Sequence, residues 1–178
     1  MRVITGSARG TTLRTLEGDS VRPTTDKVKE AVFSAIQFEI EGRRILDLFA
    51  GSGQLGIEAL SRGAESAVFV DADKNAVKIV KENLAKTKLE FKASVAQTDS
   101  IAFLTMTDRI FDIAFLDPPY EKGLLQKALE KISGRIAQGG MVICEHPFRE
   151  ELDEEYGELK KTKEYKYSKT AVTVYRKG

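Results

Sequence analysis

Strand-like and helix-like patterns alternate along this chain from residue 44 onward, and this alternation most constrains the fold. Apolar runs typical of buried strands occur at 45–50, 67–70, 89–95, 111–116 and 141–145. Helical patterns lie between these runs and begin at Gln54, Lys74, Ile101 and Leu124. The sequence therefore predicts an α/β fold with a mostly parallel sheet and helices on both faces.

The two ends of the chain depart from this alternation. Segments 159–167 and 171–175 alternate polar and apolar residues, which predicts a C-terminal antiparallel hairpin. The helix before it is expected to run from Leu124 to Ile136, with Gly139 and Gly140 closing it.

At the other end, β-prone pieces at 2–5 and 11–14 suit a small hairpin, and Pro23 to Asp26 is typical of the start of a helix. We expect that helix to end near Gly42. Residues 1–42 are therefore an expected N-terminal extension, and 43–178 the domain that carries the site, in one structural unit.

Composition narrows the class of protein. The 178 residues are enough for one domain with a proper core, and a net charge of +1 neither favours nor excludes a polyanionic partner. The chain has one cysteine, Cys144, and one histidine, His146, so we expect no intramolecular disulfide and no metal site. No apolar stretch resembles a leader or reaches membrane-spanning length, which predicts a cytoplasmic protein without membrane contact.

A glycine-rich loop joins the first long strand to its helix, with the sequence Asp47-Leu-Phe-Ala-Gly51-Ser-Gly53-Gln-Leu-Gly56. Nucleotide-like cofactors bind at this position in doubly wound sheets, and Asp71, after the second strand, is spaced to bind ribose hydroxyls. Gly51, Gly53 and Gly56 also spell the dinucleotide pattern, so an NAD-dependent oxidoreductase is one alternative. Asp47 inside the strand favours a cofactor with a cationic amine instead, which indicates S-adenosylmethionine. A third interpretation is that the glycines serve only a tight turn.

The strand at 111–116 ends in Asp117-Pro118-Pro119-Tyr120. A carboxylate, a rigid turn with free carbonyl groups and an aromatic ring together suit a planar amine, such as the exocyclic amino group of a nucleobase. The alternative is an ordinary strand end with a proline-rich turn.

These motifs, in this order, are similar to those of amino-methyltransferases with the class I S-adenosylmethionine-dependent fold. The match extends over nearly the whole chain and includes Arg2 to Gly6, the block from Arg22 to Glu30, and Glu58 to Ala64. On these residues the chain resembles the RsmD family, whose members methylate guanine N2 in small-subunit (16S) ribosomal RNA. The resemblance implies a Rossmann-like, mostly parallel seven-stranded sheet with S-adenosylmethionine as the cofactor.

Carried onto this sequence, the resemblance assigns roles to individual residues. The catalytic residues would be Asp117, Pro118, Pro119 and Tyr120. The cofactor-binding residues would be Asp47, Phe49, Ala50, Gly51, Ser52, Gly53, Asp71, Ala72, Asp99, Ser100 and Asp117. Asp99 would accept from the adenine amine, although a helix N-cap explains it equally well.

RNA would have to be held mainly by the N-terminal segment, which is more basic than the rest of the chain. The candidate RNA-binding residues are Arg2, Arg9, Arg14, Arg22 and Lys27. These side chains could instead be ordinary exposed residues, and Arg22 could brace the cofactor pocket. We expect a monomer that acts on ribosomal RNA, within a ribosomal particle. A DNA adenine-N6 methyltransferase and a non-catalytic RNA-binding module remain alternatives.

Overall fold

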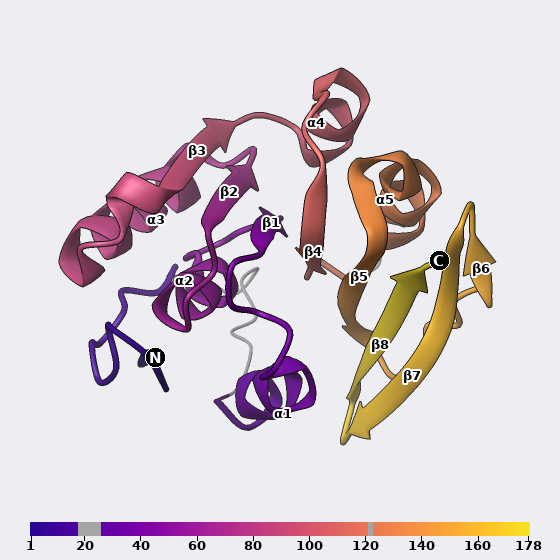
Figure 1. Cartoon of the computed structure of the whole chain (residues 1–178), viewed down its shortest axis with the longest axis horizontal. Coiled ribbons are helices and arrows are strands. Elements are labelled where there is room, and N and C mark those ends of the chain that lie inside the picture. The colour runs from indigo at the N-terminus through magenta and orange to yellow at the C-terminus, as the bar shows by residue number, and fades with distance from the viewer. Residues whose placement is uncertain (18–25, 121–122) are drawn as a thin grey trace.

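The computed structural model describes residues 1–17, 26–120 and 123–178, and Arg22 and the expected helix start at Pro23 lie outside these ranges. Its centre is one sheet of eight strands in the order β3-β2-β1-β4-β5-β8-β7-β6 (Figure 1). The parallel strands are β1 (Arg44–Leu48), β2 (Ser66–Asp71), β3 (Ala93–Gln97), β4 (Phe111–Leu116) and β5 (Ile136–Pro147). The antiparallel strands are β6 (Glu155–Tyr156), β7 (Leu159–Tyr167) and β8 (Thr170–Lys177).

Helices cover both faces of the sheet, as the sequence predicts. One face packs against α1 (Asp26–Ile36), α2 (Gln54–Ser61) and α3 (Lys74–Thr87). The other face packs against α4 (Ser100–Met106) and α5 (Leu124–Ile132). Alternate residues of each central strand serve the two cores; in β4, Phe115 faces the α1 side and Leu116 faces the α5 side. Burial on both faces explains why these strands are continuously apolar in the sequence.

The strand order reverses between β1 and β4. From β1 the chain proceeds outward through β2 and β3, and it returns to the other side of β1 as β4. The two strands are paired in parallel, with Leu48 opposite Leu116, so both end at the same edge of the sheet. Such a reversal leaves a crevice at the carboxyl ends of the strands, where ligands of open α/β sheets bind.

Several features differ from the sequence-based expectation. Helix α1 ends at Ile36 and not near Gly42. Helix α5 ends at Ile132, and Gly139 and Gly140 lie inside β5, where its pairing with β4 shifts register. A side chain at Gly140 would come within 2.7 Å of the Asp112 carbonyl oxygen, so this glycine permits close strand contact and does not close a helix. Strand β3 starts at Ala93 because Glu90–Lys92 form a 3-10 turn. The sheet has eight strands, because the two-residue β6 is added at its edge.

The N-terminal segment forms less sheet than expected. Its one described strand pairing is an isolated bridge between Arg2 and Thr12. Val3, Ala8 and Leu13 are nevertheless buried in the same core as α1, α2 and α3. Gly6 adopts a φ of 96°, and a Cβ there would overlap the backbone of Ser61, so the turn needs glycine to lie against the end of α2.

A buried carboxylate, Glu58 of α2, holds this segment in place. It accepts hydrogen bonds from the backbone N–H groups of Ile4 and Thr5 at 2.8 and 3.1 Å. It also forms ion pairs with Lys29 of α1 at 3.1 Å and with Arg62 at 2.9 Å, and the side chains of Glu58 and Lys29 are fully buried. Burial lowers the pKa of Lys29, which the negative charge of Glu58 opposes. One carboxylate thus joins three separate parts of the chain.

We expect Lys29→Met to lower the free energy of unfolding by about 3 kcal/mol, because it leaves the buried Glu58 charge with one cationic partner fewer. Lys27→Met is the matched control, since Lys27 is exposed on the same helix, and it should change stability by less than about 0.5 kcal/mol. Urea unfolding measures both. Equal stability of the two variants would contradict the role given to the Lys29–Glu58 pair.

Candidate active site

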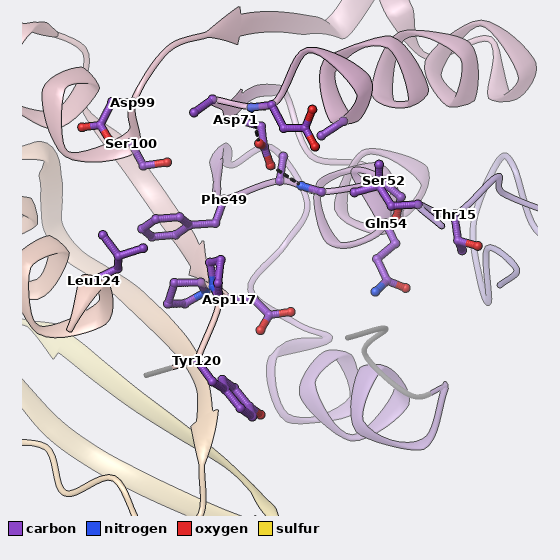
Figure 2. A pocket seen from close by; sticks show the side chains of 18 residues that line it. Thr15, Phe49, Ser52, Gln54, Asp71, Asp99, Ser100, Asp117, Tyr120 and Leu124 are labelled. Carbon is purple, nitrogen blue, oxygen red and sulfur yellow. Dashed lines mark hydrogen bonds between the residues drawn. The ribbon is translucent and has the colours of Figure 1, made fainter. Parts of the chain in front are cut away.

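A cavity of about 630 Å³ lies at the β1/β4 reversal, above the carboxyl ends of the strands (Figure 2). Most of the residues selected from the sequence line it: Phe49, Ala50, Gly51, Ser52, Asp71, Ala72, Asp99, Ser100, Asp117, Pro118, Pro119 and Tyr120. Its volume is within the range of sites for small molecules. The structure therefore brings the glycine loop, the acids after β2 and β3, and the proline turn after β4 to one place.

The glycine loop is held from the side by Asp71. One carboxylate oxygen accepts from the backbone N–H of Gly51 at 2.9 Å, and the other accepts from the N–H of Asp73, also at 2.9 Å. Burial is the largest cause that raises the pKa of Asp71, and these hydrogen bonds oppose it. Phe49 and Gly51 adopt φ values of 62° and 59°, so the loop follows a strained path that Asp71 helps to fix. Asp71 has a structural role whether or not it also binds a ribose.

Asp47 lies beneath the loop, and it is not among the residues that line the cavity. It is 2% exposed and accepts from the backbone N–H of Gly56, in the first turn of α2, at 2.9 Å. The N-cap residue Gly53 has no side chain to cap this helix, so a carboxylate from β1 does so instead. Burial raises the pKa of Asp47 well above its usual range, and the charges of Asp117 and Asp71 add to this effect.

Gly53 is likewise absent from the cavity wall, and it requires glycine because of its backbone conformation and its close neighbours. It has a φ of 81°, and a Cβ there would lie 3.2 Å from Val80. Gly56 is still more restricted, since a Cβ would come within 2.4 Å of the Phe69 ring. Gly56 therefore serves the contact between α2 and β2, Gly53 serves the turn into α2 next to α3, and Gly51 alone of the three lines the cavity.

Asp99 and Ser100 line the end of the cavity away from Gln54 (Figure 2). Asp99 is the N-cap of α4 and accepts from the N–H of Ala102 at 2.9 Å. The N-cap interpretation of Asp99 is thus confirmed, and its place on the cavity wall is compatible with the cofactor-binding interpretation as well.

The proline turn places Asp117, Pro118, Pro119 and Tyr120 on the cavity wall. Figure 2 shows the Asp117 carboxylate pointing into the same space as the side chain of Gln54. The hydroxyl of Tyr120 lies 3.3 Å from Oγ1 of Thr170 on β8, which ties the turn to the C-terminal hairpin. The ring is partly exposed, so it can present a face to a planar ligand.

Six lining residues were not selected from the sequence: Thr15, Leu16, Gln54, Asp73, Ala76 and Leu124. Gln54 follows the glycine loop directly, so its position was a usable signal. Asp73 precedes a helical pattern and caps α3 by accepting from the N–H of Asn75. Thr15 and Leu16 had no local signal, since their place depends on Asn83 of α3, which binds the backbone N–H and carbonyl of Arg14.

The candidate RNA-binding residues within the described ranges are spread over the surface and are not among the residues that line the cavity. Arg14 adjoins the lining residue Thr15 and pairs with Glu82 at 2.6 Å. Arg9 is exposed near Ser61, at the opposite end of α2 from the glycine loop. Arg2 and Lys27 are also exposed. Lys29, which adds to the basic character of the segment in the sequence, is fully buried against Glu58 and is not available to RNA. Their binding to RNA stays a prediction, and Arg22 lies outside the described residues.

Comparison with known proteins places this geometry in a family. A family model described as "Conserved hypothetical protein 95" matches residues 1–176. The "Putative rRNA methyltransferase YlbH" of Bacillus subtilis is 43% identical over 99% of this chain and 99% of its own length. The "Ribosomal RNA small subunit methyltransferase D" of Escherichia coli is 35% identical over 82% of this chain and 74% of its own length. The chain belongs to the RsmD family.

Solved structures agree with this membership. The "Putative methyltransferase yhhF" of Escherichia coli is 30% identical, with a TM-score of 0.87 over 99% of this chain and 97% of its own. A 16S rRNA N2 G1207 methyltransferase of T. thermophilus, solved with AdoMet and guanosine, shares the fold at 23% identity, with a TM-score of 0.71 over 87% of this chain and 44% of its own. The class I methyltransferase fold implied by the sequence is confirmed.

The RsmD-family chain has no helix, among the residues that the structure describes, that is long and apolar enough to cross a membrane. The same ranges hold no group of three or more His, Cys, Asp and Glu side chains that could bind a metal ion.

The buried Asp47 predicts a pH effect on stability. Because its pKa is raised in the folded state, folding takes up a proton between the ordinary and the raised value, and wild-type stability falls as pH rises through that interval. Asp47→Asn keeps an acceptor for the N–H of Gly56 but cannot ionise. Its stability relative to wild type should therefore increase as pH rises from about 4 to 8, as measured by urea unfolding.

Asp47→Ala distinguishes the effect of the capping hydrogen bond from the effect of ionisation at residue 47. It removes the acceptor for the N–H of Gly56 and should lower the free energy of unfolding by about 1 to 3 kcal/mol at the low end of this range, where Asp47→Asn should not. Parallel pH profiles for wild type and Asp47→Asn would show that Asp47 does not ionise in this interval.

Proposed function

We propose that this RsmD-family methyltransferase uses S-adenosylmethionine to methylate the exocyclic N2 amine of a guanine in small-subunit ribosomal RNA. The observation that carries the proposal is the shared cavity, in which the Asp117–Tyr120 turn faces the glycine loop. The small-subunit RNA substrate is inferred from the names of the relatives. The exocyclic amine is inferred as the target because the turn offers hydrogen-bond acceptors for its N–H groups.

The lining residues fit this cofactor. Gln54 leaves a buried carbonyl oxygen without a partner among the described residues, which is what a ligand-binding wall presents before its ligand is bound. Asp71 accepts one backbone N–H at each oxygen, and a carboxylate has about four acceptor sites, so ribose hydroxyls can still bind there. Asp99 and Ser100 would hold the adenine, and Phe49 to Ser52 would hold the remaining part of the cofactor. When bound, S-adenosylmethionine supplies an electrophilic methyl group.

The proline turn would prepare the amine. The lone pair of a guanine amine is delocalised into the ring, so the nitrogen attacks well only when its hydrogens are drawn toward acceptors. Asp117 and the carbonyl of Pro118 provide those acceptors, because neither proline has an N–H that competes for them. Tyr120 would stack on the base, and its hydrogen bond to Thr170 holds the ring in place. Asp117 can also accept the proton that the amine loses.

The identity of the RNA particle and the oligomeric state belong to this proposal. We infer that a monomer acts on the RNA within a small ribosomal particle, in the cytoplasm. Family membership favours a methyltransferase over the nicotinamide-dependent alternative. A DNA adenine methyltransferase would use the same proline turn, so the substrate has to be tested directly.

The test is to incubate the protein with methyl-labelled S-adenosylmethionine and, separately, small subunits, large subunits, naked ribosomal RNA and duplex DNA. We expect label in small-subunit RNA that digestion identifies as N2-methylguanosine. Label in N6-methyladenine of DNA would replace the proposed function with the DNA alternative.

Asp117→Ala should reduce the single-turnover rate on saturating small subunits by about 100-fold or more, because it removes an acceptor that matters most as the amine gains positive charge. Tyr120→Ala should weaken capture of the base by about 1 to 3 kcal/mol, and Tyr120→Phe, which keeps the ring, should lose much less. A wild-type rate for Asp117→Ala would refute the proposed mechanism.

The N-terminal arginines can be compared with each other. Arg14 adjoins the cavity and Arg9 lies at the far end of α2, so we expect Arg14→Ala to weaken RNA binding more than Arg9→Ala. Removal of a side chain that neutralises one phosphate should lower the slope of log affinity against log salt by about 0.7 to 0.9 unit, as filter binding at several salt concentrations would show. Wild-type slopes in both variants would remove Arg9 and Arg14 from the RNA interface.

A further inference from the structure

Gln54 lines the cavity and carries a buried, unpaired polar atom. Gln54 as a whole is 9% exposed, and its Oε1 has no hydrogen-bond partner among the described residues. Within those residues it is the one buried side-chain oxygen or nitrogen in this condition. A buried carbonyl without a donor destabilises the folded protein, so its retention at a cavity wall points to a donor that arrives with a ligand.

The place of Gln54 in the fold limits which part of a ligand it can meet. It is the first residue of α2 and follows Gly51, Ser52 and Gly53 directly. Figure 2 shows its carboxamide in the same part of the cavity as the carboxylate of Asp117, and on the other side of the site from Asp99 and Ser100. Asp71, which fits the ribose, lies between these two ends in the figure.

We propose that the carboxamide of Gln54 binds the amino-acid end of S-adenosylmethionine, with Oε1 accepting from the ammonium group and Nε2 donating to the carboxylate. This inference rests on the proposed function, because it assumes that cofactor. A carboxamide offers an acceptor and a donor side by side, which is the complement of a zwitterion.

The surrounding charge also favours an ammonium group at this end. Asp117 lines the same part of the cavity and presents a carboxylate to this end of the ligand. The first turn of α2 carries the positive end of the helix dipole, which suits the neighbouring carboxylate of the ligand. The edge of a guanine base has donors and an acceptor too, so contact with the base is the competing outcome of the test.

The test compares two ligands that differ at this end. S-adenosylhomocysteine keeps the ammonium and carboxylate groups, whereas 5'-methylthioadenosine lacks both. Gln54→Met keeps the length of the side chain and removes its donor and acceptor. By calorimetry we expect it to weaken binding of S-adenosylhomocysteine by about 10-fold or more and to leave binding of 5'-methylthioadenosine within about twofold of wild type.

Two controls separate binding from folding. Gln126→Met makes the same exchange at an exposed position on α5 outside the cavity wall, and it should leave both affinities unchanged. The ligand-free Gln54→Met protein should be at least as stable as wild type, because the substitution removes a buried oxygen that has no partner. A structural role for Gln54 would instead make the variant less stable.

Three results would overturn the inference. Equal loss of affinity for both ligands would place the contact away from the amino-acid end. Unchanged affinity for both, with a raised KM for RNA, would assign Gln54 to the base. Failure of the wild-type protein itself to bind S-adenosylhomocysteine would reject the proposed function, which distinguishes that failure from the failure of Gln54 alone.

Discussion

The parallel pairing of β1 with β4 is the constraint on which the site depends. Leu48 lies opposite Leu116, so the glycine loop and the Asp117–Tyr120 turn leave the sheet side by side. Because every parallel strand ends at the same edge, Asp71 and Asp99 then follow on the β2 and β3 side. A slip of one residue in this pairing would turn the alternate side chains of β4 toward the wrong core and would misplace the turn with them.

Several carboxylates in this protein hold backbone segments in position through hydrogen bonds that do not require a ligand. Asp47 caps α2, Asp71 holds the glycine loop, Asp99 caps α4 and Glu58 anchors the N-terminal segment. Each satisfies N–H groups that would otherwise lack partners at helix starts or in loops. Asp71 and Asp99, together with Asp117, also place carboxylates on the cavity wall, which suits a cationic cofactor.

The N-terminal segment is bound to the protein near both ends of α2. Glu58 holds its first turn at one end of α2, and Asn83 binds the backbone of Arg14 near the other end. Asn83 also donates to the carbonyl of Ser52 in the glycine loop at 2.9 Å. One side chain thus connects the segment that carries Thr15 and Leu16 with the loop that would carry the cofactor.

The sequence by itself determined the strand and helix alternation, the bounds of β7 and the start of α3, because these depend on local periodicity and caps. It also placed the proline turn at a strand end and identified most of the cavity wall. The tertiary structure alone decided that Asp47 and Gly53 support the loop from behind, that Gly140 serves a strand contact, and that Thr15, Leu16 and Gln54 line the cavity. These outcomes depend on contacts between residues far apart in the chain, such as Asn83 with Arg14 and Asp112 with Gly140, which no local pattern encodes.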